Sequence, residues 1–172
     1  MTTFNLKIKE TYHPVVFQII DQLQQRQCWF ETFEHEPVRT SEEAAKIRNG
    51  YNLSQGAKAL IVRLKFSKNE SKFVMLVLPG DARFDKQKVT GVFKTKDIRF
   101  ASEAEVSEIT SGVELGGVPP FGNLFGLEVI VDPSLLEHEK IIFNAGDRRF
   151  SIAMNTADYV TLVQPKVVRI IL

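Results

Sequence analysis

The sequence predicts a mixed α/β fold in a single domain that spans residues 1–172. Segments with the apolar spacing of an amphipathic helix are interspersed with segments rich in β-branched and aromatic residues, and hairpin connections recur between the latter. The 172 residues, of which 44% are hydrophobic and 25% charged, suit one globular core. No repeat, low-complexity tract or linker indicates a second domain.

The first half of the chain predicts two helices, a short strand and a β-hairpin. Pro14 suits the first turn of a helix because its fixed φ and missing N–H cost nothing there. Thr40 and Glu43 have the spacing of a capping box, and Gly50 suits the end of the helix that they begin. The expected elements are a helix over 14–27, a strand over 29–33, a helix over 40–50, and hairpin strands over 57–65 and 72–78.

The second half predicts shorter helices between further strands. Ser102 and Glu105 form a second capping box, and Asn155 with Asp158 predicts the start of a last short helix. The expected elements are a helix over 81–89, an extended segment over 97–101, a helix over 102–112, strands over 127–131, 140–144 and 149–154, a helix from 155, and a strand over 167–171.

Charge is distributed unevenly along the chain, although the net charge is only +1. Between residues 58 and 100, eleven lysine and arginine residues stand against four acidic residues, whereas between 101 and 143 one lysine stands against eight acidic residues. Binding to a nucleic acid backbone requires a basic surface, because neutralised phosphates supply most of the non-specific affinity. The alternative is that the two segments pair with each other or are solvated.

Several classes of site are excluded by residue types that are missing or scattered. Cys28 is the only cysteine, so the chain cannot form an intrachain disulfide or a multi-cysteine metal site. His13, His35 and His138 lack the short spacings of metal ligands, and the phosphate-binding, dinucleotide-binding and serine-hydrolase motifs are absent. We therefore expect no metal and no cofactor. Residues 1–10 lack an apolar signal core and no apolar run is long enough to cross a bilayer, which predicts a cytoplasmic protein without a membrane partner.

Lys58 is the first candidate for chemistry. In the strand predicted over 57–65 it has the same parity as Leu60, Val62 and Leu64, so its side chain points to an apolar face. Burial disfavours the charged form of a lysine and lowers its pKa unless a partner restores the charge, and lysines in such places are often functional. The alternative is a strand-end lysine whose stem packs on the apolar face and whose amine reaches water.

The segment from Gly116 to Gly122 is the second candidate. Its glycines let the backbone approach a ligand closely and its prolines stiffen the loop, so its N–H groups suit an anion or the oxyanion of ester hydrolysis. Segments of this composition are also common as plain turns, and this alternative stays open.

The turn over 143–149 is the third candidate. It joins two expected strands and could present Asn144 to a ligand. As a bare sequence it is equally an ordinary hairpin connection. Neither the loop nor the turn establishes a function by itself.

Taken in order, these segments resemble the YbaK/prolyl-tRNA synthetase-associated editing family. The family pattern is a helix start of the type Ser-Glu-Glu-Ala-Ala, a strand with a lysine, a Gly-x-x-x-Pro-Phe-Gly loop and a late Asn/Gly turn. The resemblance covers residues 11–172 and rests on four motifs in the expected order. This sequence reads Thr40-Ser41-Glu42-Glu43-Ala44-Ala45, Gly56-Ala57-Lys58-Ala59-Leu60, Gly116-Gly117-Val118-Pro119-Pro120-Phe121-Gly122 and Asn144-Ala145-Gly146-Asp147-Arg148-Arg149.

The resemblance implies a barrel-like mixed β-sheet flanked by helices and the activity of a trans-editing aminoacyl-tRNA deacylase. Such an enzyme hydrolyses the ester of a small amino acid wrongly attached to the 3′ end of tRNA. Mischarged aminoacyl-tRNA is then the expected partner, with an aminoacyl-tRNA synthetase as a further one. Lys58 is implied as the catalytic residue, and the terminal ribose hydroxyl of the tRNA helps to activate water. The substrate-binding residues implied are Gly116, Gly117, Val118, Pro119, Pro120, Asn144 and Gly146.

Two other functions stay open from the sequence. A binding module with the same fold could bind tRNA or a synthetase without hydrolysis, although the presence of Lys58 and the whole loop argues against it. An unrelated small-ligand binding protein would show no salt-dependent association with tRNA.

Overall fold

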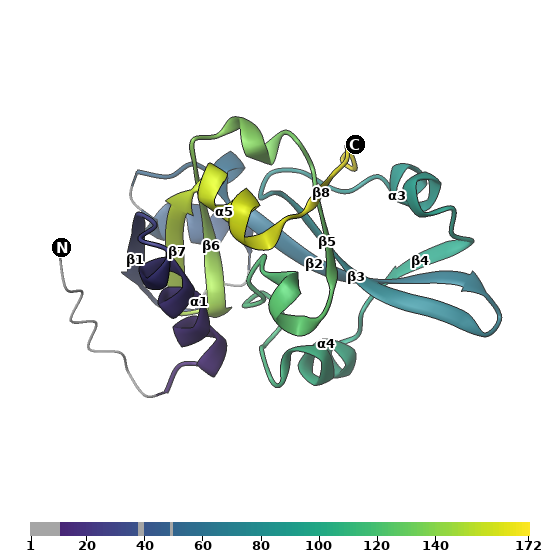
Figure 1. Cartoon of the computed structure of the whole chain (residues 1–172), viewed down its shortest axis with the longest axis horizontal. Helices are drawn as coiled ribbons and strands as arrows, with labels where there is room; N and C mark the ends of the chain where they lie inside the picture. The colour runs from purple at the N-terminus through teal and green to yellow at the C-terminus, as the bar shows by residue number, and fades with distance from the viewer. Residues whose placement is uncertain (1–10, 38–39, 49) are drawn as a thin grey trace.

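The computed structural model describes residues 11–37, 40–48 and 50–172, and its strands form two sheets (Figure 1). The three-stranded sheet has the order β1 (Phe30–Glu34), β7 (Phe150–Asn155), β6 (Lys140–Asp147). The five-stranded sheet has the order β4 (Asp97–Phe100), β2 (Ala57–Ser67), β3 (Glu70–Pro79), β5 (Glu128–Val131), β8 (Lys166–Val167). The first sheet is antiparallel, and the second is mixed because β5 pairs in parallel with β3 and β8.

The predicted mixed α/β class is confirmed, but the strands do not close into a barrel. Within the described residues, β4 and β8 form the two edges of the larger sheet and are not paired with each other. The two sheets meet where Gly56, just before β2, forms a single parallel bridge with Ile142 of β6. This junction brings the start of β2 next to β6, and it positions the site described below.

The helix starts follow the capping signals in the sequence. Thr40 Oγ1 accepts a hydrogen bond from the Glu43 amide at 3.1 Å, and Ser102 with Glu105 forms a complete capping box. Asn155 occupies the predicted cap position, although its side chain makes no capping bond. No helix in the described ranges is long and apolar enough to span a membrane. The helices are α1 (Pro14–Gln25), α2 (Ser41–Ile47), α3 (Lys86–Phe93), α4 (Glu103–Thr110) and α5 (Thr156–Val163), with short 3₁₀ turns η1 (Leu53–Gln55), η2 (Gly122–Phe125) and η3 (Leu135–Glu137).

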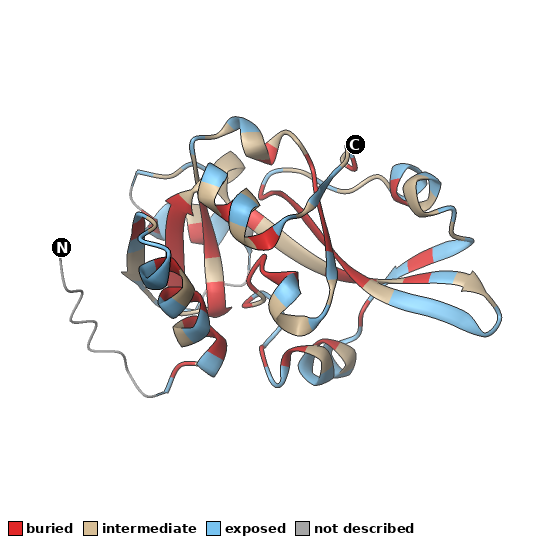
Figure 2. Ribbon diagram, viewed as in Figure 1, coloured by how far each residue is buried: buried red, intermediate tan, exposed pale blue. Residues whose placement is uncertain are grey.

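The predicted hairpin is confirmed and is longer than expected. Its strands β2 and β3 pair in antiparallel register, with Lys58 opposite Leu78 and Val62 opposite Val74. The far end of the hairpin projects from the body together with β4 and α3, and its surface is largely exposed (Figure 1 and Figure 2). The near end of β2 carries the predicted lysine into the body of the molecule.

The two faces of β2 pack into two different cores because successive strand residues point to opposite sides. Ala57 and Ile61 belong to the main core, which also contains residues of α1, α5 and the three-stranded sheet. Val62 and Leu64 belong to a smaller core that includes Val89 of α3. The strand that carries the candidate lysine is therefore held on both faces.

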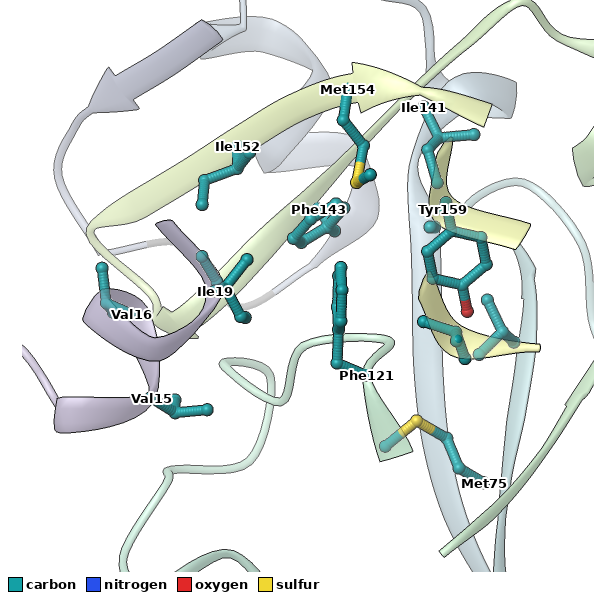
Figure 3. Close-up of a cluster of buried hydrophobic side chains, with 14 of the residues drawn as sticks. Val15, Val16, Ile19, Met75, Phe121, Ile141, Phe143, Ile152, Met154 and Tyr159 are labelled. Atoms are coloured by element: carbon teal, nitrogen blue, oxygen red, sulfur yellow. The ribbon is translucent and has the colours of Figure 1, made fainter. Parts of the chain in front are cut away.

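The centre of the main core is aromatic. The ring of Phe121 lies 5.4 Å from that of Phe143 and 5.6 Å from that of Tyr159, measured between centroids (Figure 3). The buried Tyr159 hydroxyl donates a hydrogen bond to the carbonyl oxygen of Pro120 at 2.7 Å. The end of the Gly/Pro-rich loop is thus anchored in the core.

The helix expected over 81–89 begins later, at Lys86. Asp85 explains the shift, because its Oδ1 accepts hydrogen bonds from the amides of Gln87 at 2.9 Å and Lys88 at 3.3 Å. An aspartate in this position caps a helix that starts at the next residue. Of the residues before it, Gly80 and Asp81 form a turn that follows β3, and Phe84 forms an isolated bridge with Ile171.

The last strand, expected over 167–171, pairs with the sheet only at Lys166–Val167. Beyond it, the buried carboxylate of Asp132 binds backbone amides of the chain end. Its Oδ2 accepts hydrogen bonds from the amide of Ile170 at 2.8 Å and from that of Ile171 at 3.2 Å. The Asp132 side chain and an isolated antiparallel bridge between Ile171 and Phe84 therefore take the place of the strand ladder at this end of the chain.

Candidate functional site

A cavity of about 780 Å³ opens at the junction of the two sheets. Its wall comes from α2, the start of β2, α4, the loop after α4, and β6. Those elements are distant in the sequence, and the Gly56 bridge to β6 helps to gather them. The volume lies within the range of sites that bind small molecules.

Four of the eight predicted site residues line this cavity: Lys58, Gly116, Val118 and Asn144. They come from β2, the loop after α4, and β6. Motifs that are separate along the chain therefore contribute residues to one cavity. The role of each residue in substrate binding or catalysis stays a prediction.

The other four predicted residues, Gly117, Pro119, Pro120 and Gly146, lie outside the lining of the cavity. Gly117 and both prolines are buried in the loop. Gly146 has φ of +115° and packs directly on Val15 of α1, where an added Cβ would collide with the valine. These four residues are buried in the loop and the turn and do not face the cavity.

Lys58 is half-buried on the apolar face of β2 that its parity predicts. Its Nζ donates a hydrogen bond to the carbonyl oxygen of Ala82 at 2.6 Å. Burial lowers the pKa of Lys58, and the negative charge of Glu42 opposes that shift. An ammonium group has three donors, so Lys58 keeps donors for a ligand beyond the one that Ala82 occupies.

The loop after α4 is tied to β6 and to the turn between β6 and β7. Gly116 has φ of +87°, and its carbonyl oxygen accepts a hydrogen bond from Asn144 Nδ2 at 2.7 Å. The Gly117 amide donates to the carbonyl oxygen of Glu114 at 2.9 Å, so this N–H is used inside the loop. Arg148 Nη2 lies 2.5 Å from Glu114 Oε2 and holds the loop from the turn between the strands.

Arg48, which no motif marks, reaches the cavity from the end of α2. It is only 6% exposed, and burial lowers its pKa to about 10. Its Nη2 donates to Asn144 Oδ1 at 2.7 Å and its Nε donates to Ser151 Oγ at 3.0 Å. One signal was present in the sequence: Arg48 follows the buried Ala44 by four residues, a spacing that places both on one helix face.

The hydroxyl of Ser151 extends this network to His35. Nε2 of His35 lies 2.7 Å from Ser151 Oγ, and Nδ1 lies 2.9 Å from the carbonyl oxygen of Glu36. A carbonyl only accepts, so Nδ1 carries the proton, and burial lowers the pKa of His35, which favours the neutral ring. The Ser151 hydroxyl has two possible acceptors, His35 Nε2 at 2.7 Å and Asn144 Oδ1 at 3.2 Å. We assign its proton to the nearer His35, while the Ser151 oxygen accepts from Arg48.

Three of the five charged residues of the cavity wall are cations. The charged lining residues are Arg48, Lys58, Arg148, Glu103 and Glu114. Since Glu114 pairs with Arg148, the cavity suits a ligand with anionic or electron-rich oxygens. In the described part of the chain, no three His, Cys, Asp or Glu side chains gather as a metal ion would require.

The basic and acidic segments of the sequence are joined by two ion pairs. Lys72 lies 3.2 Å from Glu128, and Arg99 lies 2.7 Å from Glu105. No further ion pair joins the two segments among the described residues. Mutual pairing therefore neutralises only a small part of the asymmetry, and the projecting lobe keeps exposed cations that include Lys65, Lys68 and Lys96.

Comparison with known proteins relates this architecture to tRNA editing. Residues 35–162 match the model of the aminoacyl-tRNA editing domain. The chain is 35% identical over 152 residues to the multifunctional Ser/Thr-tRNA deacylase ProXp-y of Escherichia coli (strain K12), which covers 88% of this chain and 89% of that protein. It is 26% identical over 113 residues to a proline–tRNA ligase of Sulfurihydrogenibium sp. (strain YO3AOP1), which covers 66% of this chain and 18% of the ligase. A solved structure provisionally assigned as a trans-editing enzyme for prolyl-tRNA synthetase has a TM-score of 0.76 and 23% identity, covering 93% of this chain and 98% of the other. The chain belongs to the aminoacyl-tRNA editing domain family.

Proposed function

We propose that this protein is a trans-editing hydrolase that removes a wrongly attached amino acid from tRNA. The observation that carries this proposal is the meeting of Lys58, Gly116 and Asn144, from three separate elements, at one cavity. Membership of the editing family and the deacylase name of the E. coli relative support the same reaction. Aminoacyl-tRNA is used in the cytoplasm, and we place the protein there.

The reaction adds water to the ester carbonyl and breaks the bond to the ribose oxygen, which releases the free amino acid and the tRNA. We assign Lys58 to hold the aminoacyl end, because it lines the cavity and Ala82 uses only one of its donors. The loop at Gly116 supplies backbone groups to the ester, and the terminal ribose hydroxyl of the tRNA helps to activate the water. Positioning and stabilisation of the oxyanion then account for the rate.

The substrate amino acid in this proposal is small and carries a hydroxyl group, as in serine or threonine. The E. coli relative is named for these two amino acids, and polar groups of Asn144 and Arg48 line the cavity. A synthetase gains only about 1–3 kcal/mol from one methyl group, so errors among small amino acids need a second site that hydrolyses them.

A deacylation screen tests the proposed function. Purified protein is incubated with a panel of tRNAs charged with alanine, cysteine, serine, threonine or a large amino acid, and the ester that remains is measured. Loss of the seryl or threonyl ester, with the large amino acid retained, is the expected result. Salt-dependent tRNA binding without any hydrolysis would indicate a binding module instead, and absence of both would indicate a protein for small ligands.

A further inference from the structure

Arg48 is a buried cation that has no acidic partner among the residues that the structure describes. It is 6% exposed, and no carboxylate forms an ion pair with it in the described ranges. The two acidic residues of the cavity wall are both exposed, and Glu114 is held by Arg148. A charge this deeply buried is costly unless it is paired.

The neutral partners of Arg48 occupy one side of its guanidinium group. Nε and Nη2 donate to Ser151 Oγ and Asn144 Oδ1, whereas Nη1 makes no hydrogen bond within the described residues. Nη1 lies near Gly56, 3.9 Å from where a Cβ on that residue would stand, and Gly56 also lines the cavity. The orientation of the group is therefore fixed, and its remaining donors lie at the cavity wall.

We propose that Arg48 is a further substrate-binding residue, which holds an anionic oxygen of the aminoacyl-tRNA through Nη1. This inference rests on the proposed function for the identity of the ligand. A guanidinium that is already oriented loses little entropy when it binds an oxygen anion, and burial of the group strengthens the attraction. An anionic oxygen also supplies the compensating charge that the fold does not provide.

Two oxygens of an aminoacyl-tRNA can take this place. One is the ester carbonyl oxygen, on which negative charge develops as water attacks, and the other belongs to the phosphodiester that precedes the terminal nucleoside. The first would make Arg48 a group that stabilises the transition state, and the second would make it a group that binds the substrate equally in both states. The deacylation kinetics of an Arg48 variant distinguish binding to the ester oxygen from binding to the phosphodiester.

Inorganic phosphate is the first probe, because its oxygens resemble both the phosphodiester and a tetrahedral oxyanion. We expect phosphate to raise the melting temperature of the wild-type protein in a saturable manner and to raise that of Arg48→Met much less. Arg26→Met, which removes an exposed arginine at the end of α1, is the control and should respond as the wild type does. Arg48→Gln keeps a donor for Asn144 without the charge, and it serves if the methionine variant does not fold.

Single-turnover deacylation is the second measurement. If Arg48 binds the oxyanion, the rate at saturating tRNA should fall by about 10²-fold, as expected for one lost donor, while the tRNA concentration for half saturation stays the same. If Arg48 binds the phosphodiester, the half-saturating concentration should rise and the saturated rate should be retained. Either result supports the proposal and identifies the oxygen.

The proposal is overturned if a folded Arg48 variant responds to phosphate as the wild type does and deacylates with both kinetic constants unchanged. Arg48 would then only support the structure through Asn144 and Ser151. The phosphate measurement does not depend on hydrolysis. A wild-type protein that binds phosphate through Arg48 but deacylates no tRNA would therefore refute the proposed function and leave the anion site in place.

Discussion

Asn144 connects Arg48 to Gly116 through the two ends of one side-chain amide. Its Oδ1 accepts from Arg48 Nη2 at 2.7 Å, and its Nδ2 donates to the Gly116 carbonyl oxygen at 2.7 Å. The amide thus links the buried cation at the end of α2 to the loop that was predicted from its glycines and prolines. The conformation of the loop and the orientation of Arg48 depend on the same residue.

Asn144→Asp should reduce turnover by about tenfold, the effect of losing one ordinary hydrogen bond. The carboxylate can still accept from Arg48, so the variant should fold, but it cannot donate to Gly116 and repels that carbonyl oxygen. Single-turnover deacylation beside a melting curve measures both effects. Asn69→Asp, in the exposed turn of the hairpin, is the control. A variant with the wild-type rate would show that the link to Gly116 does not matter for catalysis.

Lys58→Ala should nearly abolish deacylation while the melting temperature stays the same or rises. The apolar face of β2 no longer has to accommodate an amine, but the substrate loses its point of attachment. Lys58→Arg should not restore activity, because a planar fork on a longer stem cannot take the place of an ammonium group. Lys140→Ala, which removes a half-buried lysine packed over Trp29 outside the cavity, should leave activity intact. Wild-type deacylation by folded Lys58→Ala would remove this residue from the mechanism.

Gly116→Ala and Gly126→Ala form a matched pair. Both glycines have positive φ, +87° and +70°, and an alanine in that conformation costs about 1–2 kcal/mol. The two variants should therefore lose similar stability in urea unfolding. Only Gly116 lines the cavity, so only Gly116→Ala should also lose turnover, by up to about 10²-fold. Equal activity in the two variants would make the loop an ordinary turn.

Affinity for tRNA should fall steeply as salt concentration rises. Replacing Lys65, Lys68 and Lys96 with alanine should reduce the slope of log affinity against log salt by up to about 0.9 for each lysine that contacts a phosphate. Lys72→Ala should change the slope less, because Glu128 already pairs with that lysine. Filter binding over a series of salt concentrations gives the slopes, and the rate at saturating tRNA should be unchanged. Identical slopes for the triple variant and the wild type would place the tRNA elsewhere.

Asp132 should make the stability of the fold sensitive to acid. Its burial favours the neutral form, but hydrogen bonds from Ser134 and from the amides of Ile170 and Ile171 outweigh this and lower its pKa. A carboxyl group with a lower pKa in the folded state contributes stability that is complete above its unfolded pKa and is lost as the pH falls toward the folded value.

Urea unfolding between neutral pH and about pH 3 measures this contribution, since a free aspartate titrates near pH 4. Asp132→Asn should be less stable than the wild type at neutral pH, and the difference between them should shrink as the pH falls. Asp81→Asn, at an exposed position, is the control. A constant difference at all pH values would show that the charge of Asp132 is not what holds the end of the chain.

Local sequence determined where many helices and strands lie, because helix caps and strand alternation depend only on residues a few positions apart. The capping boxes at Thr40 and Ser102 specify helix starts through their own side chains, and alternation along 57–65 specifies a strand and the face on which Lys58 lies. The hairpin follows from two such strands and a polar turn. The motifs that resemble the editing family also lie in these short segments, and their order along the chain indicated the family correctly.

Tertiary structure decided the features that depend on partners distant in the sequence. The last strand ended early where Asp132 binds amides almost forty residues away and where Ile171 forms a bridge with Phe84. The two sheets stayed separate because they meet at a single bridge and not along paired edges. Gly146 matched the family turn, yet its positive φ serves close packing against Val15 of α1. The site role of Arg48 could not be predicted either. Helical spacing could suggest that it is buried, but only the folded chain shows that its hydrogen bonds go to neutral Asn144 and Ser151 and that no carboxylate among the described residues pairs with it.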